Sequence, residues 1–234
     1  MILKIEDLHA SYGGSLVLQG VNLSIQKGEI KALMGRNGMG KTTLLKTIMG
    51  LLAAQAGNIL FDGRPIQGCQ THEIASRGIS YVPQGREIFG EFTVWENLRL
   101  GTLRNPRSMR KIPRDIFEYF PILYERRNQR AGSFSGGEQQ MLAIARALVG
   151  QPKLLLLDEP SEGIQPSIVD QICEILRKIS VETGLTILIV EQNVDMIMDL
   201  AAGCSFMEKG QIVQTCSIDD IRMDESIITC HMGV

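Results

Sequence analysis

The segment "GRNGMGKT", residues 35–42, constrains the fold of this chain more than any other stretch. It fits the pattern G-x-x-x-x-G-K-[ST]. It follows the apolar run "EIKALMG" and precedes "KTTLLKTIMGL", whose apolar residues recur at helical spacing. A strand that enters a glycine-rich turn and leaves it as a helix is typical of α/β proteins with a parallel sheet. The pattern therefore predicts an α/β fold with a P-loop core.

The same segment suits the binding of phosphate groups. Gly35, Gly38 and Gly40 permit backbone conformations in which successive N–H groups point inward, and the start of the following helix adds its positive end. Lys41 would reach the β- and γ-phosphates, and the hydroxyl of Thr42 would bind a magnesium ion. We expect ATP and Mg²⁺ at this loop.

The rest of the chain continues the alternation of strands and helices. Apolar runs predict strands within residues 58–63, 79–84, 153–160 and 186–191, an amphipathic helix over 166–180, a hairpin over 204–217 and short helices after it. We expect one domain over residues 1–234. Its P-loop core with a parallel sheet would take residues 1–84 and 151–234, with an N-terminal antiparallel β-subdomain. A helical insertion subdomain would occupy residues 85–150.

Two adjacent acids end the predicted strand "KLLLLDEP". Polar groups at the carboxyl ends of parallel strands gather where ligands bind. Asp158 would support the magnesium ion, and Glu159 would orient or deprotonate the attacking water. The alternative, two acids that only cap a turn, is less favoured beside a phosphate-binding loop.

A second anion-binding pattern lies in "SFSGGEQQMLAIARAL", where a serine and two glycines open a helix. One nucleotide needs only one phosphate loop. Two such devices in one chain are explained if two subunits form a head-to-tail dimer, each offering its "SGGEQ" turn to the nucleotide of the other.

The strand "TILIV" ends abruptly in Glu191, Gln192 and Asn193. By the same argument, this stretch is a candidate ligand-binding site. For Gln192, a cap of the strand end is the alternative interpretation.

Composition narrows the class of protein. The chain has 234 residues, 44% of them hydrophobic and 21% charged, as expected of a globular domain. It has no apolar run long enough to cross a membrane, its N-terminus contains acids, and its five cysteines show no metal-binding spacing. We expect a protein of the cytosol with free thiols.

The net charge of −2 hides a basic region. Between residues 99 and 130, nine basic residues face three acidic ones, a local charge of +6; the basic ones are Arg99, Arg104, Arg107, Arg110, Lys111, Arg114, Arg126, Arg127 and Arg130. They form either a solvated surface or a face for an anionic or membrane-proximal partner. Without interleaved aromatic residues, we expect no nucleic acid.

Taken together, the motifs resemble those of the ATP-binding cassette (ABC) family. "GRNGMGKT" is similar to its Walker A, "LLLLDE" to its Walker B and "FSGGEQ" to its signature motif. The resemblance implies catalytic roles for Glu159, Gln192 and Lys41, and metal ligation by Thr42, Gln84 and Asp158. It implies nucleotide contacts by Tyr12, Gly35, Asn37, Gly38, Gly40, Lys41, Thr42, Thr43, Gln84, Ser135, Gly136, Gly137 and Glu138. Tyr12 would stack on adenine, although it could equally be a packed strand residue.

Three positions depart from the family pattern. Phe134 replaces the usual leucine of the signature motif, Gln165 stands where the D-loop has aspartate, and Gln192 replaces the switch histidine. The resemblance implies that Glu191 and Gln192 lie beside the γ-phosphate, where Gln192 either senses the phosphate or only caps the strand. Glutamine retains a hydrogen-bond donor but cannot carry a positive charge. We expect this site to hydrolyse ATP slowly or to be unequal to that of a partner.

The motifs "VEQN", "GREIF" and "EPSEGIQPSIV" resemble those of the smaller ATPase of hydrophobic amino-acid importers, most closely the urea branch. The resemblance implies uptake of urea, a related small amide or a branched-chain amino acid. It also implies two transmembrane permease subunits, a paralogous ATPase or a second copy of this chain, and indirectly a periplasmic binding protein. The chain would then lie peripherally at the cytoplasmic face of the inner membrane. The alternative is a soluble cassette ATPase that acts on a cytosolic scaffold, as in iron–sulfur assembly.

Overall fold

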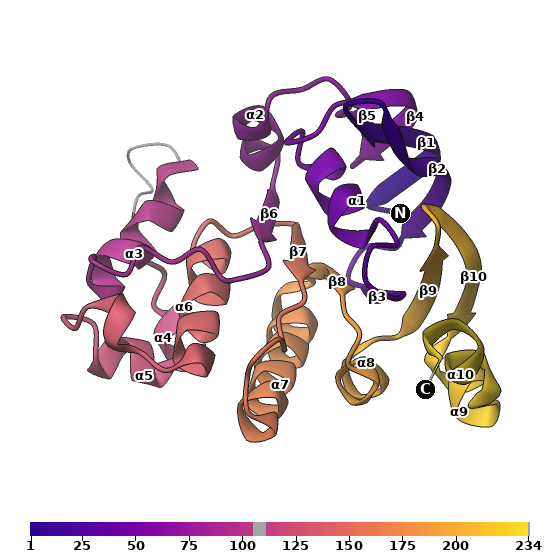
Figure 1. The fold of residues 1–234 in the computed structure, drawn as a ribbon. Coiled ribbons are helices and arrows are strands. Elements are labelled where there is room, and N and C mark those ends of the chain that lie inside the picture. Colours follow the sequence, from indigo (N-terminus) through magenta and orange to yellow (C-terminus); the bar gives the residue numbers. More distant parts are fainter. Residues whose placement is uncertain (105–110, 234) are drawn as a thin grey trace.

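The central element is a six-stranded sheet, shown in Figure 1, in a computed structural model that describes residues 1–104 and 111–233. Arg107 and Arg110 of the basic region lie outside the described residues. The strand order is β10-β9-β3-β8-β7-β6. The strands are β3 (Ile30–Met34), β6 (Ile79–Val82), β7 (Leu154–Asp158), β8 (Thr186–Val190), β9 (Gly203–Glu208) and β10 (Gln211–Ser217). All neighbours are parallel except β10, which pairs with β9 in antiparallel fashion.

The sheet is covered on both faces. Every residue of β3, β7 and β8 is buried, which explains why these strands are apolar throughout. Alternate residues serve opposite faces, since Leu155 and Leu157 belong to one hydrophobic core while Leu154 and Leu156 belong to the other. The first core includes residues of α7 (Pro166–Thr183) and α8 (Val194–Leu200), and the second includes those of α1 (Lys41–Ile48).

A second, antiparallel sheet packs with α1 in that second core. Its order is β2-β1-β4-β5, with β1 (Leu3–Tyr12), β2 (Ser15–Ile25), β4 (Ala54–Phe61) and β5 (Arg64–Pro65). The N-terminal antiparallel strands were predicted, whereas the sequence left open which sheet β4 would join. A short helix, α2 (Thr71–Ser76), then leads to β6.

The insertion between β6 and β7 is helical, as predicted, and lies beside β6 at one side of the central sheet in Figure 1, with Leu142 and Ile144 in the first hydrophobic core. It contains α3 (Val94–Gly101), α4 (Asp115–Tyr119), α5 (Pro121–Glu125) and α6 (Gly136–Leu148). Residues 112–127, "IPRDIFEYFPILYERR", lie within the predicted helical insertion and have a continuous helical pattern. The structure divides this segment into two helices before Pro121, because proline has no N–H to continue the first helix.

The C-terminal segment covers the edge of the central sheet. Lys209 and Gly210, with φ of 44° and 78°, turn β9 into β10 at the predicted position. The helices α9 (Ile218–Met223) and α10 (Ser226–Met232) follow. His231 of α10 stacks on Phe206 and bonds to Glu208 at 2.7 Å. Within the described part of the chain, no helix is long and apolar enough to cross a membrane.

Candidate nucleotide-binding site

The loop between β3 and α1 is shaped by glycines. Gly35 has a φ of 154°, and an added Cβ would lie 2.4 Å from the carbonyl oxygen of Met207, so no other residue fits. Gly40 caps α1 with a φ of 105°. The first hydrogen bond of this helix joins the N–H of Leu44 to the carbonyl of Gly40. The N–H groups ahead of it are therefore left for an anion, as phosphate binding requires.

Lys41 is turned into this loop. Its ammonium donates to the carbonyl oxygens of Gly35 at 2.5 Å and Arg36 at 3.0 Å, and lies 3.9 Å from a carboxylate oxygen of Glu159. Only 4% of the side chain is exposed, and this burial lowers the pKa of Lys41. The ammonium thus already lies among the groups that would surround a phosphate.

Asp158 sits at the end of β7, facing the start of α1. Its two oxygens accept hydrogen bonds from the Thr42 hydroxyl at 3.0 Å and the Tyr81 hydroxyl at 2.9 Å. Burial raises the pKa of Asp158, while both hydrogen bonds oppose the rise. A buried carboxylate beside a threonine hydroxyl is a hard-oxygen donor set that fits Mg²⁺. Tyr81 was not predicted, because a tyrosine within a strand gives no sign of the partner it will meet.

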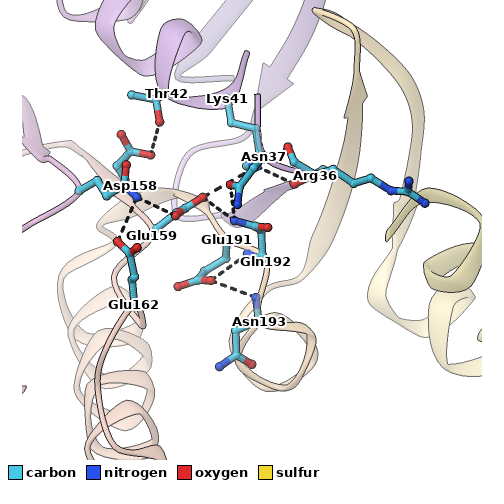
Figure 2. A network of polar contacts seen from close by, with 12 residues as sticks. Arg36, Asn37, Lys41, Thr42, Asp158, Glu159, Glu162, Glu191, Gln192 and Asn193 are labelled. Atoms are coloured by element: carbon cyan, nitrogen blue, oxygen red, sulfur yellow. Dashed lines mark hydrogen bonds and ion pairs between the residues drawn. The ribbon is translucent and has the colours of Figure 1, made fainter. Parts of the chain in front are cut away.

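Glu159 lies at the centre of a polar network, shown in Figure 2. Its carboxylate accepts one bond from Gln84 at 3.0 Å and another from Gln192 at 2.8 Å. Gln192 also donates to the side-chain oxygen of Asn37 at 2.8 Å. The ends of β6, β7 and β8 and the phosphate loop are thereby joined around one carboxylate.

A cavity of about 200 Å³ opens between these elements. Among the described residues, its walls are Val17, Asn37, Gly38, Met39, Gly40, Lys41, Thr42, Thr43, Gln84 and Glu159. The structure thus brings together most of the predicted nucleotide contacts of the core. Val17 of β2 is an addition that no motif indicated.

Comparison with known proteins decides the family. A family model described as "ABC transporter" matches residues 18–162. The chain belongs to the ABC transporter family. It is an ABC ATPase, and the ATP-binding fold expected from its motifs is confirmed.

Relatives match this ABC ATPase over most of its length. It is 43% identical to the high-affinity branched-chain amino acid transport ATP-binding protein BraG of Pseudomonas aeruginosa, over 91% of each chain. It is 35% identical to the lipopolysaccharide export system ATP-binding protein LptB of Haemophilus influenzae, over 99% and 97%. The structure of the ADP conformation of MJ1267, an ATP-binding cassette of an ABC transporter, matches with a TM-score of 0.87 and 27% identity, over 100% and 99%.

The signature motif of this ABC ATPase lies away from the Walker A cavity. None of the described residues that line the cavity comes from positions 135–138. Ser135 instead caps α6: its hydroxyl oxygen accepts from the N–H of Glu138, and the carboxylate of Glu138 accepts from the N–H of Ser135. Glu138 also pairs with Arg126, which lies 4.3 Å over the ring of Phe134. Contact of this motif with a nucleotide stays a prediction that needs a second subunit.

The remaining predicted positions are spread around the site. Tyr12 ends β1 and is 48% exposed, outside the walls of the cavity. Gln165 is the N-terminal cap residue of α7 and precedes Pro166. Gln84 bonds to Glu162 at 3.0 Å as well as to Glu159, a partner that no motif predicted.

Proposed function

We propose that this ABC ATPase energises uptake of a small polar solute through a membrane permease. Branched-chain amino acids are the first candidates, with urea and related small amides next. The identity to BraG supports the amino acids, and the motifs around Gln84 and Gln165 support the urea branch. The observation that supports ATP-driven work at this site is the carboxylate of Glu159, held between Gln84 and Gln192 beside Lys41.

Each side chain has a role in this proposal. Thr42 and Asp158 would hold the magnesium ion, which when bound neutralises charge on the phosphates. Glu159 orients and deprotonates the attacking water, because it directly follows β7 and lines the cavity. Gln192 and Gln84 each donate one N–H to that carboxylate and so fix its direction.

A head-to-tail dimer, of two copies or of this chain with a paralogue, would complete the site. Ser135, Gly136, Gly137 and Glu138 begin a helix whose N-terminal end would face the nucleotide on the other subunit. Binding of ATP at both sites favours the closed dimer, and loss of the γ-phosphate allows it to reopen.

The surface expected to meet the permease is an apolar groove beside β6. Leu51, Phe89, Leu100 and Ala147 are among the residues that line it, and Leu51 and Phe89 are each at least half exposed. The loop from Gln84 to Phe89 joins this groove to the catalytic carboxylate. A movement of Glu159 would thus be transmitted through this loop to the permease.

Capture of the partners tests the role in transport. A tagged Glu159→Gln chain, held with ATP and Mg²⁺, is expected to retain integral membrane subunits from detergent-solubilised membranes of its own cell, and Phe89→Asp is expected to abolish this. Capture of a soluble scaffold instead would overturn the proposal in favour of an assembly ATPase. Uptake of labelled leucine and labelled urea by cells lacking the gene then separates the two solutes.

A further inference from the structure

The acid that follows β8 does not take part in the nucleotide cavity. Glu191 is 2% exposed, and its carboxylate turns away from the phosphate loop toward the backbone of two neighbouring segments. Figure 2 shows it below Gln192, bonded to the turn that follows the strand. A buried carboxylate is retained only where fixed donors replace the water it has lost.

Three N–H groups supply this replacement. One oxygen accepts from the N–H of Ser161 at 2.8 Å. The other accepts from the N–H groups of Gln192 at 2.8 Å and Asn193 at 3.0 Å. The first donor belongs to the segment after β7 and the other two to the segment after β8. One side chain therefore joins the turns that follow two adjacent strands.

These turns carry the groups that act on ATP. The side chain of Gln192 bonds to Glu159 and Asn37, while its backbone N–H bonds to the carboxylate of Glu191. Glu159 is itself tied to β8, because its N–H donates to the carbonyl of Val190 at 2.8 Å. Ser161 begins the segment that continues to Gln165, where α7 is capped.

We propose that Glu191 is a positioning residue for ATP hydrolysis, whose buried carboxylate holds the backbones of Gln192 and Ser161 in one frame so that Gln192 meets Glu159. The inference rests on ATP hydrolysis at Glu159 and on a working contact from Gln192. Glutamine cannot replace this acid, because one of its two terminal atoms is a donor and would face an N–H group. Either the Ser161 bond or the bonds to Gln192 and Asn193 would be lost.

The first test measures ATP turnover by the full chain carrying Glu191→Gln. We expect kcat to fall by about tenfold or more, with the KM for ATP changed by less than about threefold, because the phosphate loop is untouched. Glu191→Asp, which keeps the carboxylate, is expected to recover part of the loss. The matched control is Glu29→Gln, an acid that accepts a backbone N–H from Gln26 at the opposite end of β3.

The second test repeats Glu191→Gln in a Gln192→Ala chain. If Glu191 acts through Gln192, Glu191→Gln should lower kcat less in the Gln192→Ala chain than in the unmodified chain. The fold-loss in kcat should be at least about fivefold smaller in the Gln192→Ala chain. An equal loss in both backgrounds, or a kcat within about twofold of the Glu29→Gln control, would overturn the inference. If Gln192→Ala itself leaves turnover unchanged, the proposed role of Gln192 in hydrolysis is wrong. The positioning role of Glu191, which depends on Gln192, is then wrong as well.

Amide hydrogen exchange in the unmodified chain gives a readout independent of turnover and of whether the variants fold. The N–H groups of Ser161, Gln192 and Asn193 are expected to open together, with one common exchange free energy. Faster and independent exchange of the Ser161 N–H would contradict the inference that Glu191 holds the two turns together.

Discussion

At the scale of single residues, the site is built from buried polar groups that depend on fixed partners. Asp158 is 1% exposed and is held by two hydroxyl groups, while Lys41 is held by two loop carbonyls. Burial shifts the pKa of Asp158 upward and that of Lys41 downward. In both, burial opposes the charged form, which is the form that binding of magnesium and phosphate requires.

Asp158→Asn is expected to stabilise the chain at pH 7 when Mg²⁺ and nucleotide are absent. Because the pKa of Asp158 is raised in the folded state, the folded chain binds this proton more tightly than the unfolded chain does. The resulting stability is present below the unfolded pKa, near pH 4, and is lost as pH rises through the folded pKa. Asparagine does not titrate and avoids that loss. The Tm of Asp158→Asn should therefore exceed that of the unmodified chain at pH 7, and the difference should shrink as pH falls toward about 4.

Asp220→Asn is the control of opposite sign. Hydrogen bonds from Ser217 lower the pKa of Asp220, so its contribution to stability is present at neutral pH and is lost on acidification. This variant should lower the Tm at pH 7, and its deficit should shrink toward low pH. Thermal unfolding in EDTA across this range measures both, and a difference of the same sign in the two variants would contradict the account.

Sequence reasoning located the residues of the site better than it located their contacts. The phosphate loop, Asp158 and Glu159 follow from motif and strand pattern, since each stands where a strand ends. Tyr81 was not assigned a partner. Glu191 was expected beside the γ-phosphate, but its carboxylate accepts backbone N–H groups outside the cavity. A hydroxyl in a strand or an acid after one gives no local sign of whether it bonds to a carboxylate or to the backbone of another segment.

At the scale of elements, the signature helix α6 combines stability with an expected role in catalysis. Ser135 and Glu138 form a capping box at its start. Ser135→Ala should lower the free energy of unfolding by about 1 kcal/mol, which is about 2–4 °C in Tm for a chain of this size. It should also lower ATP turnover about tenfold or more by removing a donor from the partner's nucleotide.

The chain offers a matched control in α9. Ser217 caps that helix with the same box, closed by Asp220. Ser217→Ala should cost a similar free energy of unfolding while turnover stays within about twofold of the unmodified chain. Equal turnover in the two variants would show that the cap at Ser135 is structural only.

At this scale the sequence predicted the type of the elements but not all their boundaries or pairings. The burial of β7 and β8 on both faces could be predicted from the sequence, because both strands consist of nearly continuous apolar runs. The pairing of β4 with β1 depends on contacts between residues far apart in the chain. Pro121, in contrast, indicates a helix boundary from the sequence alone. The boundary was not predicted because the residues on both sides of Pro121 have a helical pattern.

At the scale of the whole molecule, the cavity at the phosphate loop and the signature motif lie apart in one chain. The Walker A cavity is formed between the two sheets and the strand ends, whereas the signature motif begins α6 in the helical insertion. The Glu159→Gln chain is therefore expected to form a dimer when ATP and Mg²⁺ are added and to remain a monomer in EDTA. Sedimentation velocity measures this directly, and a monomer under both conditions would indicate that only a paralogous ATPase completes the site.

The proposed mechanism assigns hydrolysis to Glu159, whose carboxylate Gln192 orients. Single-turnover ATP hydrolysis at high protein concentration tests this assignment most directly. The unmodified chain is compared with Glu159→Gln, Gln192→Ala and Gln192→His. We predict that Glu159→Gln lowers the rate by about 10²-fold or more, that Gln192→Ala lowers it less, and that Gln192→His raises it. A Glu159→Gln chain that keeps its rate within about threefold would contradict the central claim.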